Sequence, residues 1–93
     1  MAKQIGADRT RETRTLAQAL GAELTDLRKS KQLSQQQLAD RLGYDVSHVR
    51  QTEMGGNPTL ELLAAIASAF SLNVSELLRR AEDRRSQGDN RRA

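Results

Sequence analysis

Three residues between positions 35 and 54 restrict the fold more than any other feature of the sequence. Ala39, Gly43 and Val49 place a small residue, a glycine and a β-branched apolar residue at offsets of 0, 4 and 10. A small side chain at 39 lets two helices cross with their backbones close together. Gly43 suits a helix end with positive φ, which is cheap only for glycine. Val49 then points back into the angle between the helices, so the spacing predicts two short helices joined by a tight turn.

Residues that cap helices precede four apolar segments. These caps are Ser34, Asp45, Thr59 and Asn73. Gln37 follows Ser34 by three residues, and Glu76 follows Asn73 by the same interval, so both pairs fit a capping box. Each cap stabilises a helix by about 1 kcal/mol. The sequence therefore predicts four helices that begin directly after these residues.

Apolar residues recur at helical spacing within each predicted helix. Leucines at 16, 20, 24 and 27 predict an earlier helix that ends near Lys31, although Gly21 disfavours an unbroken one. The other residues expected to face inward are Leu38, Ala39 and Leu42; Val46 and Val49; Leu60, Leu63, Ala64, Ile66, Ala67 and Phe70; and Val74, Leu77, Leu78 and Ala81. No segment has the two-residue period of a strand. The expectation is a compact all-α domain of five helices.

The charges divide the chain into three parts. The total formal charge is +3, yet residues 16–78 are mildly acidic and both ends are basic. We expect a basic, partly helical arm at 1–15, the folded domain at 16–78 and a charged, partly disordered tail at 79–93. Disorder is expected for about the first eight residues and beyond Gly88, while the pair Glu76 and Arg80 favours a fifth helix reaching about residue 85.

Composition excludes several classes of protein. There is no cysteine and one histidine, His48, so a metal site is not expected, and no cofactor is predicted. Aromatic residues make up 2% of the chain, too few for a stacking platform for single strands. No acid–base or nucleophile constellation indicates an enzyme. The chain shows no signal peptide and no apolar run of membrane-spanning length. We expect a cytoplasmic, nucleoid-associated protein.

The segments around the predicted turn are similar to a known family. The run Leu33-Ser34-Gln35-Gln36-Gln37-Leu38-Ala39, then Leu42-Gly43, then Glu53-Met54-Gly55-Gly56-Asn57-Pro58-Thr59-Leu60 closely resembles the phage-repressor, or Cro-type, helix-turn-helix family. The resemblance covers about residues 24–78. It implies a five-helix, lambda-repressor-like domain that binds double-stranded DNA as a homodimer on a palindromic operator, with the helix at about 46–53 in the major groove.

The resemblance also implies roles for individual positions. The expected base contacts are Val46, Ser47, Arg50 and Gln51, and the expected phosphate contacts are Gln35, Gly55, Gly56, Asn57 and Thr59. Gln51 could bond adenine bidentately, and Arg50 could contact guanine or a phosphate. Arg28 and Glu53 match a pair that, in the family, joins the first helix to the end of the third. Phe70, Leu72, Val74 and Leu78 are the expected dimer interface, with the first helix as an alternative.

Two features leave alternatives open. Thr52 stands where the family usually has a larger apolar residue, so either the packing there is looser or the hydroxyl bonds the preceding turn. Arg50 is the only cation on the predicted recognition helix. The leading hypothesis is a transcriptional regulator, in particular a dimeric autorepressor. The alternative is a protein-interaction module of the same fold, an antitoxin or anti-activator that binds a partner protein. The terminal arginines either follow DNA or are solvated ends.

Overall fold

The structure, a computed structural model, describes residues 2–92, with side chains for residues 11–88. Its elements in chain order are α1 (Ala2–Ser30), α2 (Gln35–Leu42), α3 (Val46–Glu53), α4 (Leu60–Ala69) and α5 (Val74–Arg92). No strand occurs in residues 2–92. This confirms the predicted all-α class and the five-helix architecture.

The four caps are confirmed, and each gives a helix a defined start. The Ser34 hydroxyl accepts the Gln37 N–H at 3.0 Å, and the Gln37 amide oxygen accepts the Ser34 N–H at 2.8 Å. Asn73 and Glu76 form the same reciprocal pair at 2.8 and 3.1 Å. Asp45 and Thr59 cap α3 and α4. Because the caps satisfy N–H groups that a helix leaves unpaired, helices of 8 to 10 residues are well delimited.

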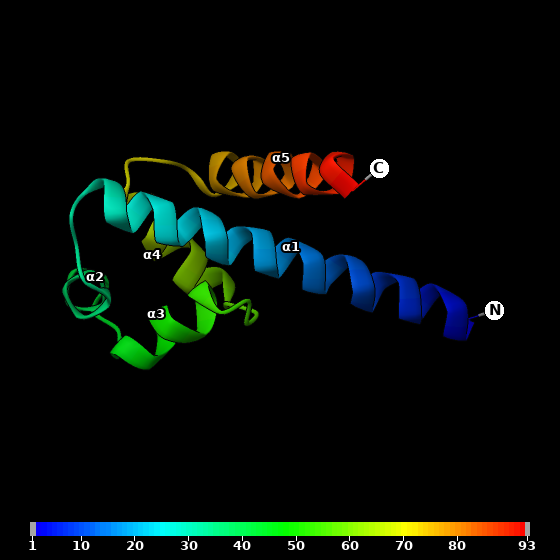
Figure 1. Ribbon diagram of the computed structural model, residues 1–93. Coiled ribbons are helices and arrows are strands. Elements are labelled where there is room, and N and C mark those ends of the chain that lie inside the picture. The colour runs from blue at the N-terminus through cyan, green and yellow to red at the C-terminus, as the bar shows by residue number, and fades with distance from the viewer. Residues whose placement is uncertain (1, 93) are drawn as a thin grey trace.

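The two long helices form one layer and the three short ones the other. Figure 1 shows α1 and α5 running antiparallel along each other, with α2, α3 and α4 gathered against the C-terminal half of α1. The core lies between these layers. Its fully buried large side chains are Leu24, Leu38, Val49, Ile66 and Leu77, one from each helix. Every helix therefore contributes to a single hydrophobic core, which fixes α3 relative to the rest of the domain.

The inward face of α4 is largely the one expected, since Leu63, Ile66, Ala67 and Phe70 are buried. Two expected residues are not, because Leu60 is 77% exposed and Ala64 is also exposed, while Leu62 is buried without having been expected. Leu60 is the first residue of α4. Periodicity alone does not decide these three positions, because α4 carries apolar residues on most of its circumference.

Both ends of the chain are more helical than the sequence predicts. Gly21 does not interrupt α1, which begins at Ala2, and α5 continues to Arg92, so the expected boundaries at 15 and 78 lie inside helices. Beyond residue 78, Ala81 is fully buried and Arg84 pairs with acids of α1. These tertiary contacts stabilise the helix where composition alone predicts a solvated tail. Residues 2–8 and 89–92, for which disorder is expected, continue these two helices. The division of the chain into arm, domain and tail stays a prediction.

Among the described residues, no single helix is long and apolar enough to cross a membrane. Only α4 and α5 together reach that length and composition, as a pair bent by 93°.

Candidate DNA-binding surface

The turn between α2 and α3 has the geometry that its glycine predicts. Gly43 has a φ of +75°, and its N–H is directed at the carbonyls of Ala39 and Asp40. Ala39 and Val49 are 0% and 1% exposed, so they lie on the inner sides of the two helices. A Cβ at position 43 would meet no atom within 4 Å. Glycine is therefore required at this position for its backbone conformation and not for space.

The C-terminal end of α3 packs directly on the backbone of α1 at Gly21. A Cβ at this glycine would lie 2.5 Å from the carbonyl oxygen of Thr52 and 2.7 Å from that of Glu53. Real Cβ atoms do not approach backbone oxygens so closely, so only glycine allows this contact. Sequence reasoning treated Gly21 only as a weak point in a helix, because nothing in the local pattern shows which element will lie against it.

An ion pair ties the same end of α3 to α1 and α2. Arg28 donates from Nε to Glu53 Oε2 at 2.7 Å and from Nη2 to Oε1 at 3.1 Å, and its Nη1 donates to the Leu33 carbonyl at 2.8 Å. Gln35 Nε2 donates to Glu53 Oε1 at 2.9 Å. The Arg28 and Glu53 side chains are 12% and 6% exposed. Gln35, an expected phosphate contact, thus uses one of its two amide hydrogens in a bond to Glu53.

The charge state of Glu53 follows from these contacts. Burial by itself would raise the pKa of Glu53, but hydrogen bonds from Arg28 and Gln35 and the positive charge of Arg28 lower it below its ordinary value. The carboxylate therefore stays ionised at neutral pH. A charged anchor holds the end of α3 in place.

Four side chains form an exposed stripe along α3 and its C-cap. Ser47, Arg50 and Gln51 are exposed, and Met54, one further turn along, is 84% exposed. Their spacing of i, i+3, i+4 and i+7 places them on one face of the helix. Val46, an expected base contact, is half-buried and packs against the core. Met54 was not singled out from the sequence, although its spacing from Ser47 would have placed it on this face.

Thr52 faces the opposite side of α3. It is 3% exposed, and its hydroxyl donates to the His48 carbonyl at 2.8 Å. Of the two sequence interpretations, the bond to the preceding turn is the one observed. The polar group is satisfied within α3, so the side chain can be buried on the inner side of this helix.

The loop between α3 and α4 is held tightly against α3. The N–H groups of Gly55 and Gly56 donate to the Thr52 and Gln51 carbonyls at 3.1 and 2.8 Å. Gly55 has a φ of +93°, which L side chains rarely adopt. These two expected phosphate contacts thus direct their amides inward, whereas Asn57 and Thr59 are exposed.

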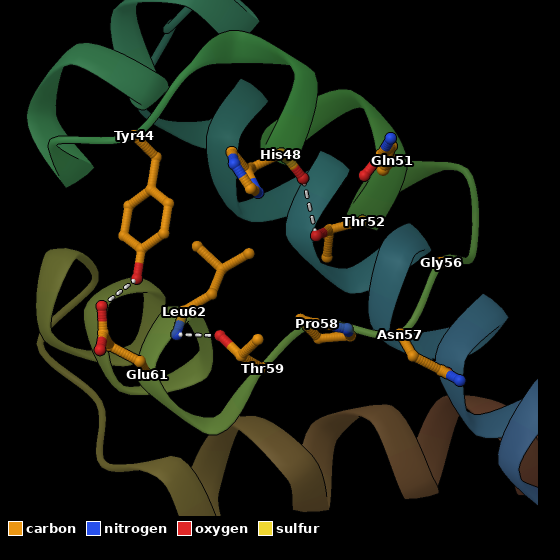
Figure 2. Close-up of a pocket in the computed structure, with 10 residues that line it drawn as sticks. All are labelled: Tyr44, His48, Gln51, Thr52, Gly56, Asn57, Pro58, Thr59, Glu61 and Leu62. Carbon is orange, nitrogen blue, oxygen red and sulfur yellow. Dashed lines mark hydrogen bonds between the residues drawn. The ribbon is translucent and has the colours of Figure 1, made fainter.

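A pocket of about 460 Å³ separates α3 from this loop and from the start of α4. Figure 2 shows His48 and Gln51 on the α3 side, Asn57, Pro58 and Thr59 on the loop side, and Tyr44 and Glu61 at one end. The Tyr44 hydroxyl donates to Glu61 Oε1 at 3.0 Å. Partial burial and this bond to a carboxylate raise the pKa of Tyr44. The pocket opens beside the exposed stripe, because Gln51 belongs to both.

Two arginines of the C-terminal helix form ion pairs on another side of the molecule. Arg84 pairs with Asp26 at 2.6 Å and with Glu23 at 3.1 Å, and Arg80 approaches Glu23 at 3.6 Å. In Figure 1, α5 lies along one side of α1 and α3 lies on the other. These ion pairs join α5 to α1. They favour a structural role for Arg84 over a DNA contact.

The expected dimer residues occupy the end of α4 and the start of α5. Phe70 is 8% exposed and belongs to the core, while Leu72, Val74 and Leu78 are half-buried. The exposed parts of the latter three side chains are what a partner surface could cover.

Comparisons with known proteins agree with this geometry. A family model described as helix-turn-helix matches residues 24–77. This chain belongs to the helix-turn-helix family. Among solved structures it is similar to the clp gene regulator ClgR from Corynebacterium glutamicum, with a TM-score of 0.75, 26% identity and 83% of each chain covered. No curated protein sequence matches the chain. The resemblance inferred from the sequence is thus confirmed.

Helix-turn-helix domains bind double-stranded DNA with their second helix, which corresponds to α3. The family match and the structural neighbour together support a DNA-binding transcription regulator rather than an enzyme. Within the described residues, no three His, Cys, Asp or Glu side chains form a group that could hold a metal ion.

Proposed function

We propose that this helix-turn-helix protein is a sequence-specific transcription regulator, in particular a dimeric repressor that binds a palindromic operator with α3 in the major groove. The observation that carries the proposal is the exposed stripe of Ser47, Arg50 and Gln51, presented by a helix whose opposite face is fixed. Val49 and Thr52 are buried behind it, and Glu53 anchors its end. A polar, rigidly held helix face of this kind is suited to the donor and acceptor pattern of base edges.

The proposed contacts divide by type. Gln51 bonds adenine N6 and N7, Arg50 bonds guanine or a phosphate, and Ser47 donates to either. Val46 offers the exposed part of its side chain to a thymine methyl. Asn57 and Thr59 of the loop contact the sugar–phosphate chain together with Gln35, whose amide keeps a second hydrogen, and the turn at Gly55 and Gly56 holds this loop close to the DNA.

Dimerisation follows from the symmetry of operators. A two-fold operator requires a two-fold protein, with recognition helices one helical turn of DNA apart, about 34 Å. We propose that the exposed parts of Leu72, Val74 and Leu78, next to Phe70, form this interface. Leu78→Arg should then shift the monomer–dimer equilibrium toward monomer in sedimentation. An unchanged equilibrium would exclude Leu78 from the interface.

The autorepressor proposal is tested with the DNA upstream of the protein's own gene. In a gel shift at about 150 mM salt, the wild type should bind this duplex at least tenfold more tightly than a scrambled duplex of equal composition. Gln51→Ala should remove most of this difference, whereas Gln36→Ala, on the exposed side of α2, should not. Equal wild-type binding to both duplexes would exclude an operator there.

A second candidate function rests on two exposed apolar side chains. Met54 is 84% and Leu60 is 77% exposed, at the two ends of the α3–α4 loop. Both would suit a protein partner such as a toxin or regulator. Under this alternative, Met54→Ser and Leu60→Ser weaken partner binding while Gln51→Ala does not; the reverse result favours DNA.

A further inference from the structure

His48 is the only histidine of the chain, and it lies in the wall of the pocket. It is exposed on α3 and lines the pocket beside Gln51 (Figure 2). Its ring packs edge-on against the ring of Tyr44, with centroids 5.4 Å apart and planes at 74°. Tyr44 is itself held by the bond from its hydroxyl to Glu61. The imidazole is therefore positioned at the pocket wall by a neighbour that is fixed in turn.

The charges around His48 make its protonation state significant. Asp45 lies one turn earlier on α3, and Glu61 faces the same pocket from α4. Arg50 is the only arginine or lysine between residues 45 and 61. With a neutral imidazole, the two carboxylates of Asp45 and Glu61 outnumber the single cation, Arg50. This surface then repels a polyanion. Protonation of His48 adds a second cation directly beside the pocket.

The rest of the pocket suits the same kind of ligand. Thr59 lies across the pocket from His48, and its hydroxyl, which accepts the Leu62 N–H at 3.1 Å, still has a hydrogen to donate (Figure 2). Gln51 connects the pocket to the exposed stripe proposed to face the bases. A DNA strand that follows the edge of the groove occupied by α3 would pass its backbone between α3 and this loop.

We propose that the pocket receives a phosphodiester of bound DNA and that His48 contacts it as the imidazolium ion, so that DNA binding takes up a proton. This inference rests on the proposed DNA-binding function. Histidine is the side chain that ordinarily titrates near neutrality, at about pH 6.5. Binding to an anion favours the protonated form, and by linkage a lower pH then favours binding.

The test measures the affinity of the full chain by fluorescence anisotropy at pH 6, 7 and 8 and constant ionic strength. The probes are a duplex of the upstream DNA and its scrambled counterpart. The wild type should bind about fivefold more tightly at pH 6 than at pH 8. His48→Gln should show no such gain between pH 8 and pH 6. Because His48 is the only histidine and the terminal amine is common to both proteins, the difference isolates this side chain.

Salt dependence gives a second readout that a purely structural effect would not move. At pH 6, the slope of log K against log salt should be steeper by about 1 for the wild type than for His48→Gln, because one more phosphate is neutralised. At pH 8 the slopes should coincide. Because His48 is exposed, the variant should keep the helix content of the wild type, and circular dichroism checks this.

The outcomes separate this inference from the function on which it rests. Binding that is tight at pH 8 but equally tight at pH 6, or a pH gain retained in His48→Gln, would overturn the role of His48 and leave DNA binding intact. Failure to bind either duplex at any of these pH values would overturn both. The expected combination is a wild type whose affinity depends on pH and a His48→Gln variant whose affinity does not.

Discussion

The ion pair between Arg28 and Glu53 provides the sharpest prediction for stability. Glu53 accepts three hydrogen bonds, two from Arg28 and one from Gln35, and its side chain is 6% exposed. Replacing one partner strands the other charge away from water, which costs about 3–5 kcal/mol for a buried pair. Since Arg28 is 12% exposed and keeps its bond to Leu33, we expect the lower end, about 3 kcal/mol, for Glu53→Met.

The assay is urea unfolding followed by the helical circular dichroism signal, and a double-mutant cycle isolates the pair. Arg28→Met and Glu53→Met should each lower the free energy of unfolding by about 3 kcal/mol, while the double variant should lose clearly less than the sum. Glu82→Gln is the matched control, because it breaks the exposed pair with Arg85, an interaction of about 0–1 kcal/mol. Additive losses, or losses below about 1 kcal/mol in the single variants, would refute the anchoring role.

Acid titration tests the same pair independently. The pKa of Glu53 is lowered in the folded state, so its stabilisation is fully present above the ordinary value of 4.5 and is lost as the pH falls through the folded pKa. The wild type should therefore lose more unfolding free energy than Glu53→Met when the pH drops from about 6 to 3. Asp45, whose pKa is also lowered through its bonds to Ser47, contributes equally to both proteins. Parallel pH profiles would contradict an ionised, paired Glu53.

Further predictions concern the packing and the backbone. Helix propensity favours alanine over glycine by about 1 kcal/mol. Gly88→Ala should show this gain in thermal unfolding, because a Cβ at position 88 would meet no atom within 4 Å. Gly21→Ala should instead destabilise the fold, and a stabilised variant would contradict the contact with α3. Leu24 is 0% exposed, so Leu24→Ala should lower the free energy of unfolding in urea by about 2–5 kcal/mol. The exposed Leu60 should lose less than about 0.5 kcal/mol on replacement by alanine. Equal losses would contradict an orientation of α4 that leaves Leu60 in solvent. Gln32 has a φ of +58°, so Gln32→Gly should raise the unfolding free energy by about 1 kcal/mol, and a loss would argue against that conformation.

The parts of the fold that depend on residues close together in the sequence could be predicted from it. The capping residues at 34, 45, 59 and 73 act within one helical turn, and Gly43 acts through its own φ. Such local preferences need no knowledge of the tertiary structure. The helix-turn-helix unit was identifiable for the same reason, because its determinants lie within 20 consecutive residues.

The remaining features depend on contacts between distant residues. Glu23 meets Arg84 across 61 positions, and contacts of this kind, together with the burial of Ala81, distinguish a packed helix from a charged tail. The close approach at Gly21 depends on where α3 ends in space. At the site, the exposed face of α3 was predictable, but the inward direction of the Gly55 and Gly56 amides was not, because it depends on the path of the loop.

The central claim, that the exposed stripe of α3 recognises a DNA sequence, is tested most directly by selection from a pool of random duplexes at about 150 mM salt. We predict that the wild type enriches one two-fold symmetric sequence with half-sites about 10 base pairs apart. Arg50→Ala and Gln51→Ala should each relax the preference at particular base pairs, with a loss of about 1–3 kcal/mol of discrimination. A wild type that enriches no sequence, or variants that enrich the same sequence as strongly, would contradict the claim.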